Sequence, residues 1–241
     1  MSDSPKISIV VPAYNEAEGI AKTLEGLLAQ SYENKQIIVV DNNSSDGTGD
    51  IARKFDVQVF LETEKGYIAA VNRGAKEADG DFITFCDADT RYPVEWAEKV
   101  VKAFQKNPKS VAVYGGADTY DSNAVSNWVN GFLYNNFLRL SRLLGLDNTS
   151  GFNFVMRRDT YLKVGGYDPK FKKMSPDIEL GTRIKKEGKI HFDTRITVSS
   201  SFRRYQDDGV VDTQLMFLKS WWMMLRGKVP DVDYDTYNAS R

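Results

Sequence analysis

The sequence has a single cysteine, a net charge close to zero and no long apolar run, and each of these features excludes a class of protein. Cys86 is the only cysteine among 241 residues, so no internal disulfide can form and a disulfide-stabilised miniprotein is excluded. Lys and Arg total 32 against 33 Asp and Glu, a net charge of −1, which predicts no nucleic-acid partner. The longest apolar patch, residues 215–225, contains Lys219 and Ser220 and is shorter than the roughly 18 residues that span a bilayer.

The residues that are present describe a folded globular protein. Hydrophobic residues make up 41% of the chain and charged residues 27%, unlike the composition of a disordered segment. A chain of 241 residues is also long enough to bury a substantial core. No basic segment followed by an apolar stretch precedes Lys6, and a single cysteine suits a reducing compartment. We therefore expect a cytoplasmic protein.

The first half of the chain alternates β-branched runs with helical patterns, which is typical of βαβ units around a mostly parallel sheet. Asn15, with Glu18 three positions later, predicts a capping box at the start of the first helix. The expected strands cover residues 7–11, 36–40, 57–61, 82–86 and 111–114, and three further helices are expected over residues 48–55, 67–78 and 94–105.

The second half has a different character, with an aromatic-rich amphipathic stretch over residues 127–146. It contains no internal repeat, low-complexity tract or linker, so we expect one α/β domain with three layers, α/β/α, rather than two domains. The further expected strands cover residues 151–156, 190–192 and 196–199, and the further expected helices cover residues 158–164, 178–186 and 210–225.

Three polar clusters follow expected strands: Asn15 with Glu16, residues 41–46, and Asp87 with Asp89. Each cluster alone is most simply a cap or a turn, because Asn, Asp and Ser hydrogen-bond their own backbone in loops. Ligands of open parallel sheets, however, gather beyond the carboxyl ends of the strands. Three such clusters together therefore predict a binding site.

The Asp87-Ala88-Asp89 segment places two carboxylates at i and i+2, on one side of an extended chain. Carboxylate oxygens suit Mn²⁺ or Mg²⁺, and such ions share their remaining positions with waters and ligand phosphates. This motif alone is common by chance. Its place at a strand end, after two other polar strand ends, favours a metal site completed by a diphosphate.

Over about residues 6–204 the sequence resembles the inverting glycosyltransferases of family 2, which have the GT-A fold. The resemblance rests on five motifs that occur in the family's order. They are Val11-Pro12-Ala13-Tyr14-Asn15-Glu16, residues 40–48 (VDNNSSDGT), Asn72-Arg73-Gly74-Ala75, Asp87-Ala88-Asp89, and Met156-Arg157-Arg158 with Val164-Gly165-Gly166-Tyr167-Asp168.

The resemblance implies a single GT-A domain over residues 1–241, with a mostly parallel central sheet. Residues 1–117 would form a Rossmann-like nucleotide-binding half, residues 118–230 an acceptor-binding half and residues 231–241 a polar tail. It also assigns nucleotide-binding residues by motif. Those that would line the nucleotide pocket or lie near the nucleotide are Pro12, Tyr14, Glu16, Arg73 and Ala88, with Asp41 accepting a hydrogen bond from the base.

For the metal and the donor sugar, the resemblance implies three further positions. Asp89 would be the main ligand of Mn²⁺ or Mg²⁺. Asp87 would reach the ribose, or the metal and its outer coordination sphere. The segment of the chain beside Gly151 would form part of the wall around the donor sugar.

The family's catalytic base belongs to an E-D-x-[DE]-L segment, and Ser175-Pro176-Asp177-Ile178-Glu179-Leu180 occupies that place. Asp177 is therefore the expected base, which would remove the proton of the acceptor hydroxyl during inversion. The alternative for Asp177 is a helix cap after Pro176. Pro176 replaces the family's usual Glu, and this departure leaves Glu179 as an alternative base.

A second departure concerns the late metal ligand, often a His in this family, which is missing from residues 196–204. His191 lies earlier, between Ile190 and Phe192, and we expect it to be a packed core residue rather than a ligand. Arg203 and Arg204 would grip the diphosphate through their guanidinium groups, the alternative being a solvated surface pair.

Two further features have simple structural interpretations. Cys86 lies inside an apolar strand pattern, and we expect it to be an inert core residue. Residues 221–225 (WWMML) are favoured as a core face or a homodimer seam. The alternative is a peripheral membrane contact, which would place the protein at the inner face of the membrane.

The sequence therefore predicts transfer of a sugar from a nucleoside-diphosphate sugar to an acceptor hydroxyl, with inversion. A UDP-sugar is favoured over a GDP-sugar because an acidic contact to a ring N–H suits uracil, although guanine also offers one. The acceptor would be a glycan, a glycolipid or a polyprenyl-linked sugar. Two alternatives stay open: a non-catalytic sugar-nucleotide or glycan-binding module of the same fold, and a sugar-phosphate nucleotidyltransferase.

Overall fold

The computed structural model describes residues 4–121, 123–147, 149–170 and 176–201, together with residues 222, 223 and 226. Its strands are β1 (Ile7–Ala13), β2 (Lys35–Asp41), β3 (Gln58–Leu61), β4 (Phe82–Phe85), β5 (Ser110–Thr119), β6 (Phe154–Arg157) and β7 (Lys189–Ser200). Its helices are α1 (Ile20–Leu28), α2 (Thr48–Ala52), α3 (Tyr67–Glu77), α4 (Trp96–Lys106), α5 (Ala124–Leu143), α6 (Arg158–Lys163) and α7 (Pro176–Glu187), with a 3₁₀ helix η1 (Gly151–Asn153).

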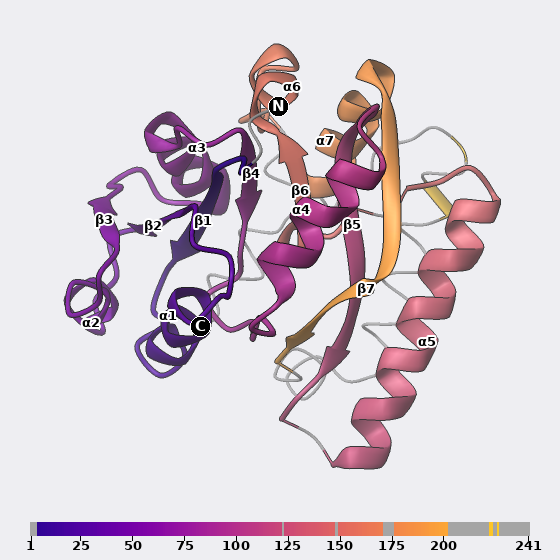
Figure 1. The fold of residues 1–241 in the computed structure, drawn as a ribbon. Coiled ribbons are helices and arrows are strands. Elements are labelled where there is room, and N and C mark those ends of the chain that lie inside the picture. Colours follow the sequence, from indigo (N-terminus) through magenta and orange to yellow (C-terminus); the bar gives the residue numbers. More distant parts are fainter. Residues whose placement is uncertain are drawn as a thin grey trace.

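These strands form one sheet in the order β3-β2-β1-β4-β6-β5-β7 (Figure 1). The pairs β1–β2, β1–β4, β2–β3 and β5–β7 are parallel. β6 is antiparallel to both of its neighbours, β4 and β5. All strands other than β6 therefore run in one direction, and the α/β class with a mostly parallel central sheet is confirmed.

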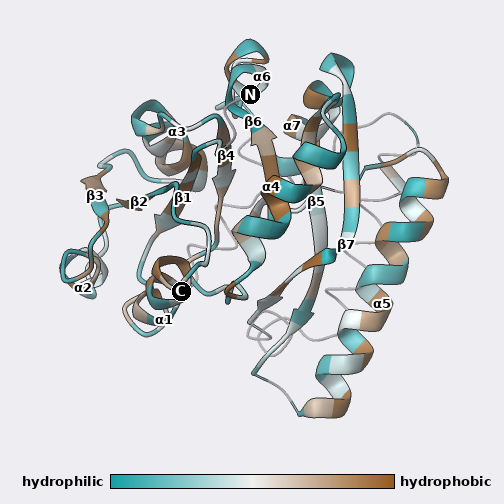
Figure 2. Cartoon of the chain, viewed as in Figure 1, coloured by the Kyte–Doolittle hydropathy of each residue, from teal (hydrophilic) through white to brown (hydrophobic). Residues whose placement is uncertain are grey.

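Helices cover both faces of the sheet and divide the core into two layers. One layer packs α1, α2 and α4 against β1 through residues such as Leu24 and Trp96. The other packs α3, α5, α6 and α7 through residues such as Val71, Leu138 and Leu180. Hydrophobic residues line β6 in the middle of the sheet, while α5 alternates hydrophobic and hydrophilic residues (Figure 2). The result is the expected α/β/α arrangement.

Helix α3 approaches the sheet at Gly74. A Cβ at this position would lie 2.3 Å from Cγ1 of Val10 on β1, so only glycine lets the helix pack this closely. The close packing fixes α3 relative to the carboxyl ends of the central strands. Asn72, on the same helix, is thereby held in a constant position relative to the site described below.

Four local expectations were wrong or incomplete. The expected capping box does not form, because α1 begins at Ile20 and its N-cap, Gly19, makes no side-chain capping bond. The two short strands expected over residues 190–199 are one continuous strand, β7. β5 extends to Thr119, beyond the expected residues 111–114, and η1 precedes β6 where a longer strand was expected.

Two other expectations concern membrane-spanning segments and the end of the chain. Among the described residues, none of the helices has the length and apolar character needed to cross a bilayer. Most of the helix expected over residues 210–225 lies outside the described residues. The division into halves at residue 117 stays a prediction.

Candidate active site

The strand directions bring four chain segments to one edge of the sheet. β1, β2 and β4 are parallel, so their carboxyl ends meet there. β6 is antiparallel, so its amino end, preceded by η1, meets the same edge. Asp41 ends β2, Asp87 and Asp89 follow β4, and Gly151 begins η1. The topology therefore places these residues along a single rim.

Cross-linking hydrogen bonds join the loops after β1 and β2. The main-chain N–H of Asn15 donates to Oγ of Ser44 at 3.1 Å, and Oδ1 of Asn15 accepts from the N–H of Ser45 at 3.0 Å. The N–H of Glu16 donates to Oγ1 of Thr48 at 2.8 Å. Asn15 adopts a φ of +52°, which Asn tolerates better than most residues. Asn15 thus joins two loops instead of capping α1.

Asp41 lies at the base of this pair of loops and is 6% exposed. Its Oδ1 accepts a hydrogen bond from the N–H of Ser44 at 3.0 Å. The neighbouring Asn42 donates to the main-chain carbonyls of Glu62 and Glu64 and accepts from the N–H of Gly66. Asp41 is therefore held between two ordered loops, in the place where a nucleotide base is expected.

The Asp87-Ala88-Asp89 segment follows β4 and is fixed mainly through its backbone. Oγ1 of Thr23, on α1, donates to the carbonyl of Ala88 at 2.6 Å. The hydroxyl of Tyr120, after β5, donates to the carbonyl of Asp89 at 3.1 Å. Both aspartates are partly exposed and Ala88 is buried. Backbone anchoring thus fixes the loop that carries the two partly exposed carboxylates.

The donor set at this loop fits a hard divalent cation that also binds phosphate. Asp87 and Asp89 offer carboxylate oxygens, the ligand type that Mg²⁺ and Mn²⁺ prefer. Throughout the described ranges, no group of three or more His, Cys, Asp or Glu side chains is placed to hold a metal ion. Two protein ligands are nevertheless sufficient for an ion whose other positions are filled by a diphosphate and water.

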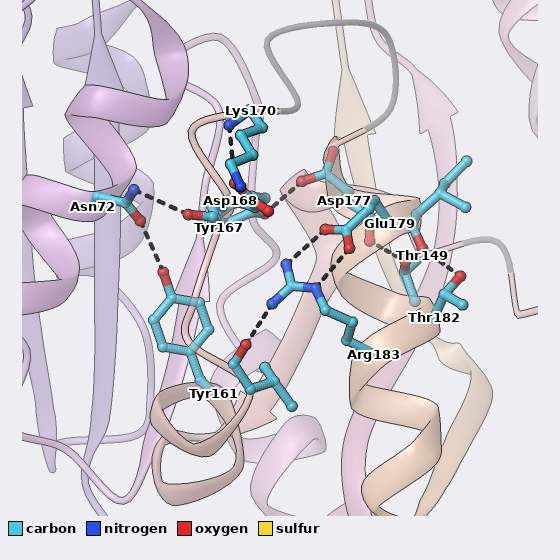
Figure 3. Close-up of polar contacts among 12 residues, drawn as sticks. Asn72, Thr149, Tyr161, Tyr167, Asp168, Lys170, Asp177, Glu179, Thr182 and Arg183 are labelled. Carbon is cyan, nitrogen blue, oxygen red and sulfur yellow. Dashed lines mark hydrogen bonds and ion pairs between the residues drawn. The ribbon is translucent and has the colours of Figure 1, made fainter. Parts of the chain in front are cut away.

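Asp177 is the second residue of α7, and its carboxylate lies against Gly151 on the rim. A Cβ at Gly151 would lie 2.6 Å from Oδ1 of Asp177. Oγ1 of Thr149 donates to the main-chain carbonyl of Asp177 at 2.7 Å. The Tyr167 hydroxyl donates to Oδ1 of Asp177 at 2.5 Å (Figure 3). The structure therefore brings Asp177 to the edge that also carries Asp41, Asp87 and Asp89.

A hydrogen bond also links the loop that carries Asp87 and Asp89 with η1, beside Asp177. The Tyr92 hydroxyl donates to the main-chain carbonyl of Phe152 at 2.8 Å. Tyr92 follows the Asp87-Ala88-Asp89 segment by three residues, and Phe152 follows Gly151 directly. The loop of the expected metal ligands and the segment beside the expected base are therefore directly connected.

Glu179, the alternative base, has both carboxylate oxygens engaged by one arginine. Nε and Nη2 of Arg183 donate to its two oxygens at 2.6 Å each (Figure 3). Nη1 of Arg183 donates to the carbonyl of Val164 at 2.6 Å, so the same side chain ties α7 to α6. Both oxygens of Glu179 are therefore occupied by Arg183, and Glu179 could take a proton from an acceptor only by giving up this ion pair. The geometry favours Asp177.

The structure places the remaining expected nucleotide-binding residues in different surroundings. Pro12 and Tyr14 lie at the end of β1 and just beyond it, and Tyr14 is 40% exposed. Arg73 lies on α3, where it pairs with Glu77 and stacks over the ring of Phe60 with its Cζ 4.9 Å from the centroid. Within the described residues, the ion pair of Arg73 is with Glu77 and not with an acidic residue of the rim. Arg203 and Arg204 lie outside the described residues.

His191 and Cys86 take no part in the site. His191 lies within β7 opposite Val113, away from the carboxyl end of that strand, and burial lowers its pKa below the ordinary value. It is half-buried rather than fully packed. Cys86 is fully buried, and burial raises the pKa of its thiol to about 12, which agrees with an inert core residue.

Two side chains that contact Asp177 were not predicted from the sequence. The Tyr167 hydroxyl and Thr149 both contact Asp177. A signal existed for the first, because a tyrosine hydroxyl in a buried segment needs a hydrogen-bond partner. No pattern near Thr149 indicated its contact, since Thr149 and Asp177 are 28 residues apart.

A separate cavity of about 560 Å³ lies along α3 and reaches the segment before α7. Its lining includes Tyr67, Arg73, Lys76, Tyr167 and Pro176. Asp41, Asp87, Asp89 and Asp177 are not among its lining residues. The cavity therefore adjoins Tyr167 and Pro176 but does not coincide with the acidic rim.

Comparison with known sequences gives one family match. Residues 8–165 match a family described as "Glycosyl transferase family 2". A poly-β-1,6-N-acetyl-D-glucosamine synthase from Staphylococcus epidermidis is 30% identical over 170 residues, covering 67% of this chain and 41% of the relative. Glycosyltransferase AglE from Haloferax volcanii is 37% identical over 108 residues, covering 42% and 36%. The chain thus spans less than half the length of these relatives.

Solved structures share the fold. The mannosyltransferase PcManGT from Pyrobaculum calidifontis, in complex with GDP-Man and Mn²⁺, has a TM-score of 0.67 and 20% identity, covering 90% of this chain and 65% of that one. Staphylococcus aureus TarS 1–349, in complex with UDP-GlcNAc, has a TM-score of 0.65 and 18% identity, covering 81% and 58%. At this identity the likeness establishes the GT-A fold alone.

Proposed function

The chain belongs to glycosyl transferase family 2, and we propose that it transfers a sugar from a nucleoside-diphosphate sugar to an acceptor hydroxyl with inversion at the anomeric carbon. The observation that carries the proposal is the position of Asp177. Its carboxylate lies against Gly151, on the sheet edge where Asp41, Asp87 and Asp89 also lie. A nucleotide, a metal-bound diphosphate and a base can be arranged in that order along one rim.

The proposed step is a single displacement. Asp177 takes the proton of the acceptor hydroxyl while the acceptor oxygen attacks the anomeric carbon. The bond from that carbon to the donor diphosphate breaks on the opposite side, and its electron pair leaves with the diphosphate. A bound Mn²⁺ or Mg²⁺, held by Asp89 and Asp87, would neutralise the charge that develops there.

Two features of the donor site support binding of a nucleotide. Asp41 is buried at the end of β2, where its Oδ1 accepts a hydrogen bond from Ser44 and its Oδ2 lies against Gly49, so a carboxylate is held in a fixed orientation where we propose that the base binds. Tyr14 offers an exposed ring at the end of β1. We favour a UDP-sugar over a GDP-sugar. A mannosyltransferase of the same fold is known with GDP-Man, and TarS with UDP-GlcNAc, so both bases belong in the test.

The acceptor class is proposed as a glycan, a glycolipid or a polyprenyl-linked sugar, and a cytoplasmic location at the inner face of a membrane stays part of the proposal. Residues 221–225, from which a membrane contact or a homodimer was predicted, lie mostly outside the described residues. Among the described residues, α5 offers a surface that either would use. Its exposed apolar residues include Val125, Trp128, Phe132, Leu133, Leu140 and Leu143.

The test is donor binding and turnover with a panel of UDP- and GDP-sugars and Mn²⁺, followed by calorimetry and by slow hydrolysis of the donor. Asp89→Ala should abolish metal-dependent nucleotide binding and activity. Asp177→Asn should keep binding within about threefold but lose activity by at least about 100-fold, within the usual range for loss of a general base.

Other outcomes would contradict particular parts of the proposal. Wild-type binding that is unaffected by a chelator would remove the metal role. Full activity in Asp177→Asn would remove the proposed base. Binding without turnover on any donor would favour the non-catalytic module, and the family match already favours glycosyl transfer over nucleotidyl transfer.

A further inference from the structure

Tyr167 joins the expected base to the nucleotide-binding part of the fold. Its hydroxyl donates to Oδ1 of Asp177 at 2.5 Å. Its main-chain carbonyl accepts from Nδ2 of Asn72, on α3, at 3.1 Å. Figure 3 shows Tyr167 between these two side chains. One residue thus contacts both a helix of the first half and the carboxylate on α7.

The ring of Tyr167 is fixed by its surroundings. The residue is 1% exposed, and its ring centroid lies 5.1 Å from that of Phe85 and 6.0 Å from that of Tyr67, in edge-to-face contacts. Phe85 ends β4, two residues before Asp87. The position of the Tyr167 hydroxyl is therefore determined by α3 and by β4, the strand that leads to Asp87 and Asp89.

The Tyr167 hydroxyl is the donor in its hydrogen bond with Asp177. Burial, and then the nearby Asp177 carboxylate, raise the pKa of Tyr167 well above its ordinary value. Tyr167 therefore keeps its proton at neutral pH, and Asp177 is the acceptor of the bond. A hydrogen bond to the charged form of a carboxylate stabilises that form, which is the form that a base requires.

We propose that Tyr167 is a positioning residue for the transfer reaction: its hydroxyl fixes the orientation of the Asp177 carboxylate relative to the donor site. The inference rests on the proposed function of Asp177. A carboxylate held only by its own helix could rotate about χ1 and χ2. The bond from Tyr167 and the close contact with Gly151 together restrict both torsions.

Tyr161 provides a matched control within the same cluster. It is 2% exposed, its ring centroid lies 6.3 Å from that of Tyr167, and its hydroxyl donates to Oδ1 of Asn72 at 3.5 Å and also bonds the backbone of Tyr167. The Tyr161 hydroxyl does not bond Asp177. Loss of either hydroxyl removes one buried polar atom, but only the loss at Tyr167 removes a hydrogen bond from Asp177 itself.

The experiment compares Tyr167→Phe and Tyr161→Phe in steady-state kinetics with the donor that turns over in the panel of UDP- and GDP-sugars. Tyr167→Phe should lower kcat about 10- to 100-fold while the KM and the calorimetric Kd for the donor change less than about threefold, because misorientation of a reacting group acts on the chemical step. Tyr161→Phe should leave kcat within about twofold. An unchanged kcat in Tyr167→Phe, or an equal loss in both variants, would overturn the inference.

A second comparison separates this inference from the proposed function. In an Asp177→Asn background, Tyr167→Phe should cause no further loss of kcat, because the group that it positions is already disabled. If Asp177→Asn is inactive but Tyr167→Phe is fully active, the function stands and the positioning role fails. If Asp177→Asn is active, the proposed function itself fails.

A third variant keeps the test open if Tyr167→Phe unfolds. Asn72→Ala removes the bond to the Tyr167 carbonyl and leaves the hydroxyl in place. It should lower kcat by a smaller factor, about threefold to tenfold, with donor Kd unchanged. A thermal melt of each variant confirms that the folded protein is being compared, and an Asn72→Ala variant with unchanged kcat would contradict the proposed anchoring.

Discussion

At the scale of single residues, the site depends on close approaches that no local pattern reveals. The sequence motifs indicated Asp41, Asp87, Asp89 and Asp177, because polar residues after apolar strands are visible in the chain itself. The partners of these residues were not visible. Thr149 and Gly151 meet Asp177 only because the antiparallel strand β6 starts at the same edge of the sheet.

Gly151 provides a test at this scale. In Gly151→Ala the new Cβ would lie 2.6 Å from Oδ1 of Asp177, so the carboxylate must move. We expect kcat to fall by about 100-fold, with donor affinity retained, because displacement of a reacting group by about 1 Å is costly.

The matched control for Gly151→Ala is Gly26→Ala on α1, where the nearest atom to the new Cβ is the Tyr92 carbonyl at an ordinary 3.7 Å. Gly26→Ala should keep full activity and should not destabilise the protein, because alanine favours helix more than glycine does. Wild-type kcat in Gly151→Ala would show that the observed contact does not set the position of Asp177.

At the scale of elements, β7 differs most from expectation. Apolar alternation indicated two short strands, because residues 193–195 (DTR) interrupt the pattern. In the structure the strand continues through an irregularity, where Tyr114 pairs with Phe192 but Gly116 pairs with Thr197. Asp193 accepts from the main-chain N–H and Nε of Arg195, at 3.0 and 2.8 Å, which stabilises the bulge. A side-chain bond within a bulge cannot be read from hydrophobic periodicity.

This bulge predicts a pH dependence of stability. The hydrogen bonds from Arg195 lower the pKa of Asp193 below its ordinary value. Such a group stabilises the fold above its unfolded pKa of about 3.9, and the stabilisation is lost as the pH falls through the lower folded pKa. Asp193→Asn should therefore lower the Tm by about 2–4 °C at pH 6, and the difference should disappear as the pH is lowered toward 2.

Thermal melts of wild type and Asp193→Asn across this pH range check the prediction. Thr194→Ala, in the exposed part of the same bulge, is the control and should shift the Tm by less than 1 °C at every pH, as expected of an exposed position (about 0.5 kcal/mol or less). A difference between Asp193→Asn and wild type that stays constant down to pH 2 would show that the charge of Asp193 does not contribute.

At the scale of the whole molecule, the order of elements up to β5 followed from the alternation of short strands and helices, and so did the α/β class. The insertion of β6 between β4 and β5 did not, because strand order depends on contacts far apart in sequence. That insertion is what brings η1, and with it Asp177, to the rim. The site could be predicted as a set of residues, while its arrangement required the fold.

The most direct test of the central claim is a crystal structure with Mn²⁺ and a non-hydrolysable nucleotide sugar, in which the anomalous signal locates the metal. The account predicts Mn²⁺ beside Asp89 and the diphosphate, the base of the nucleotide at Asp41, and the Asp177 carboxylate facing the anomeric carbon on the side opposite the diphosphate. A nucleotide bound instead in the cavity along α3, with Mn²⁺ absent from Asp89 or Asp177 remote from the sugar, would contradict it.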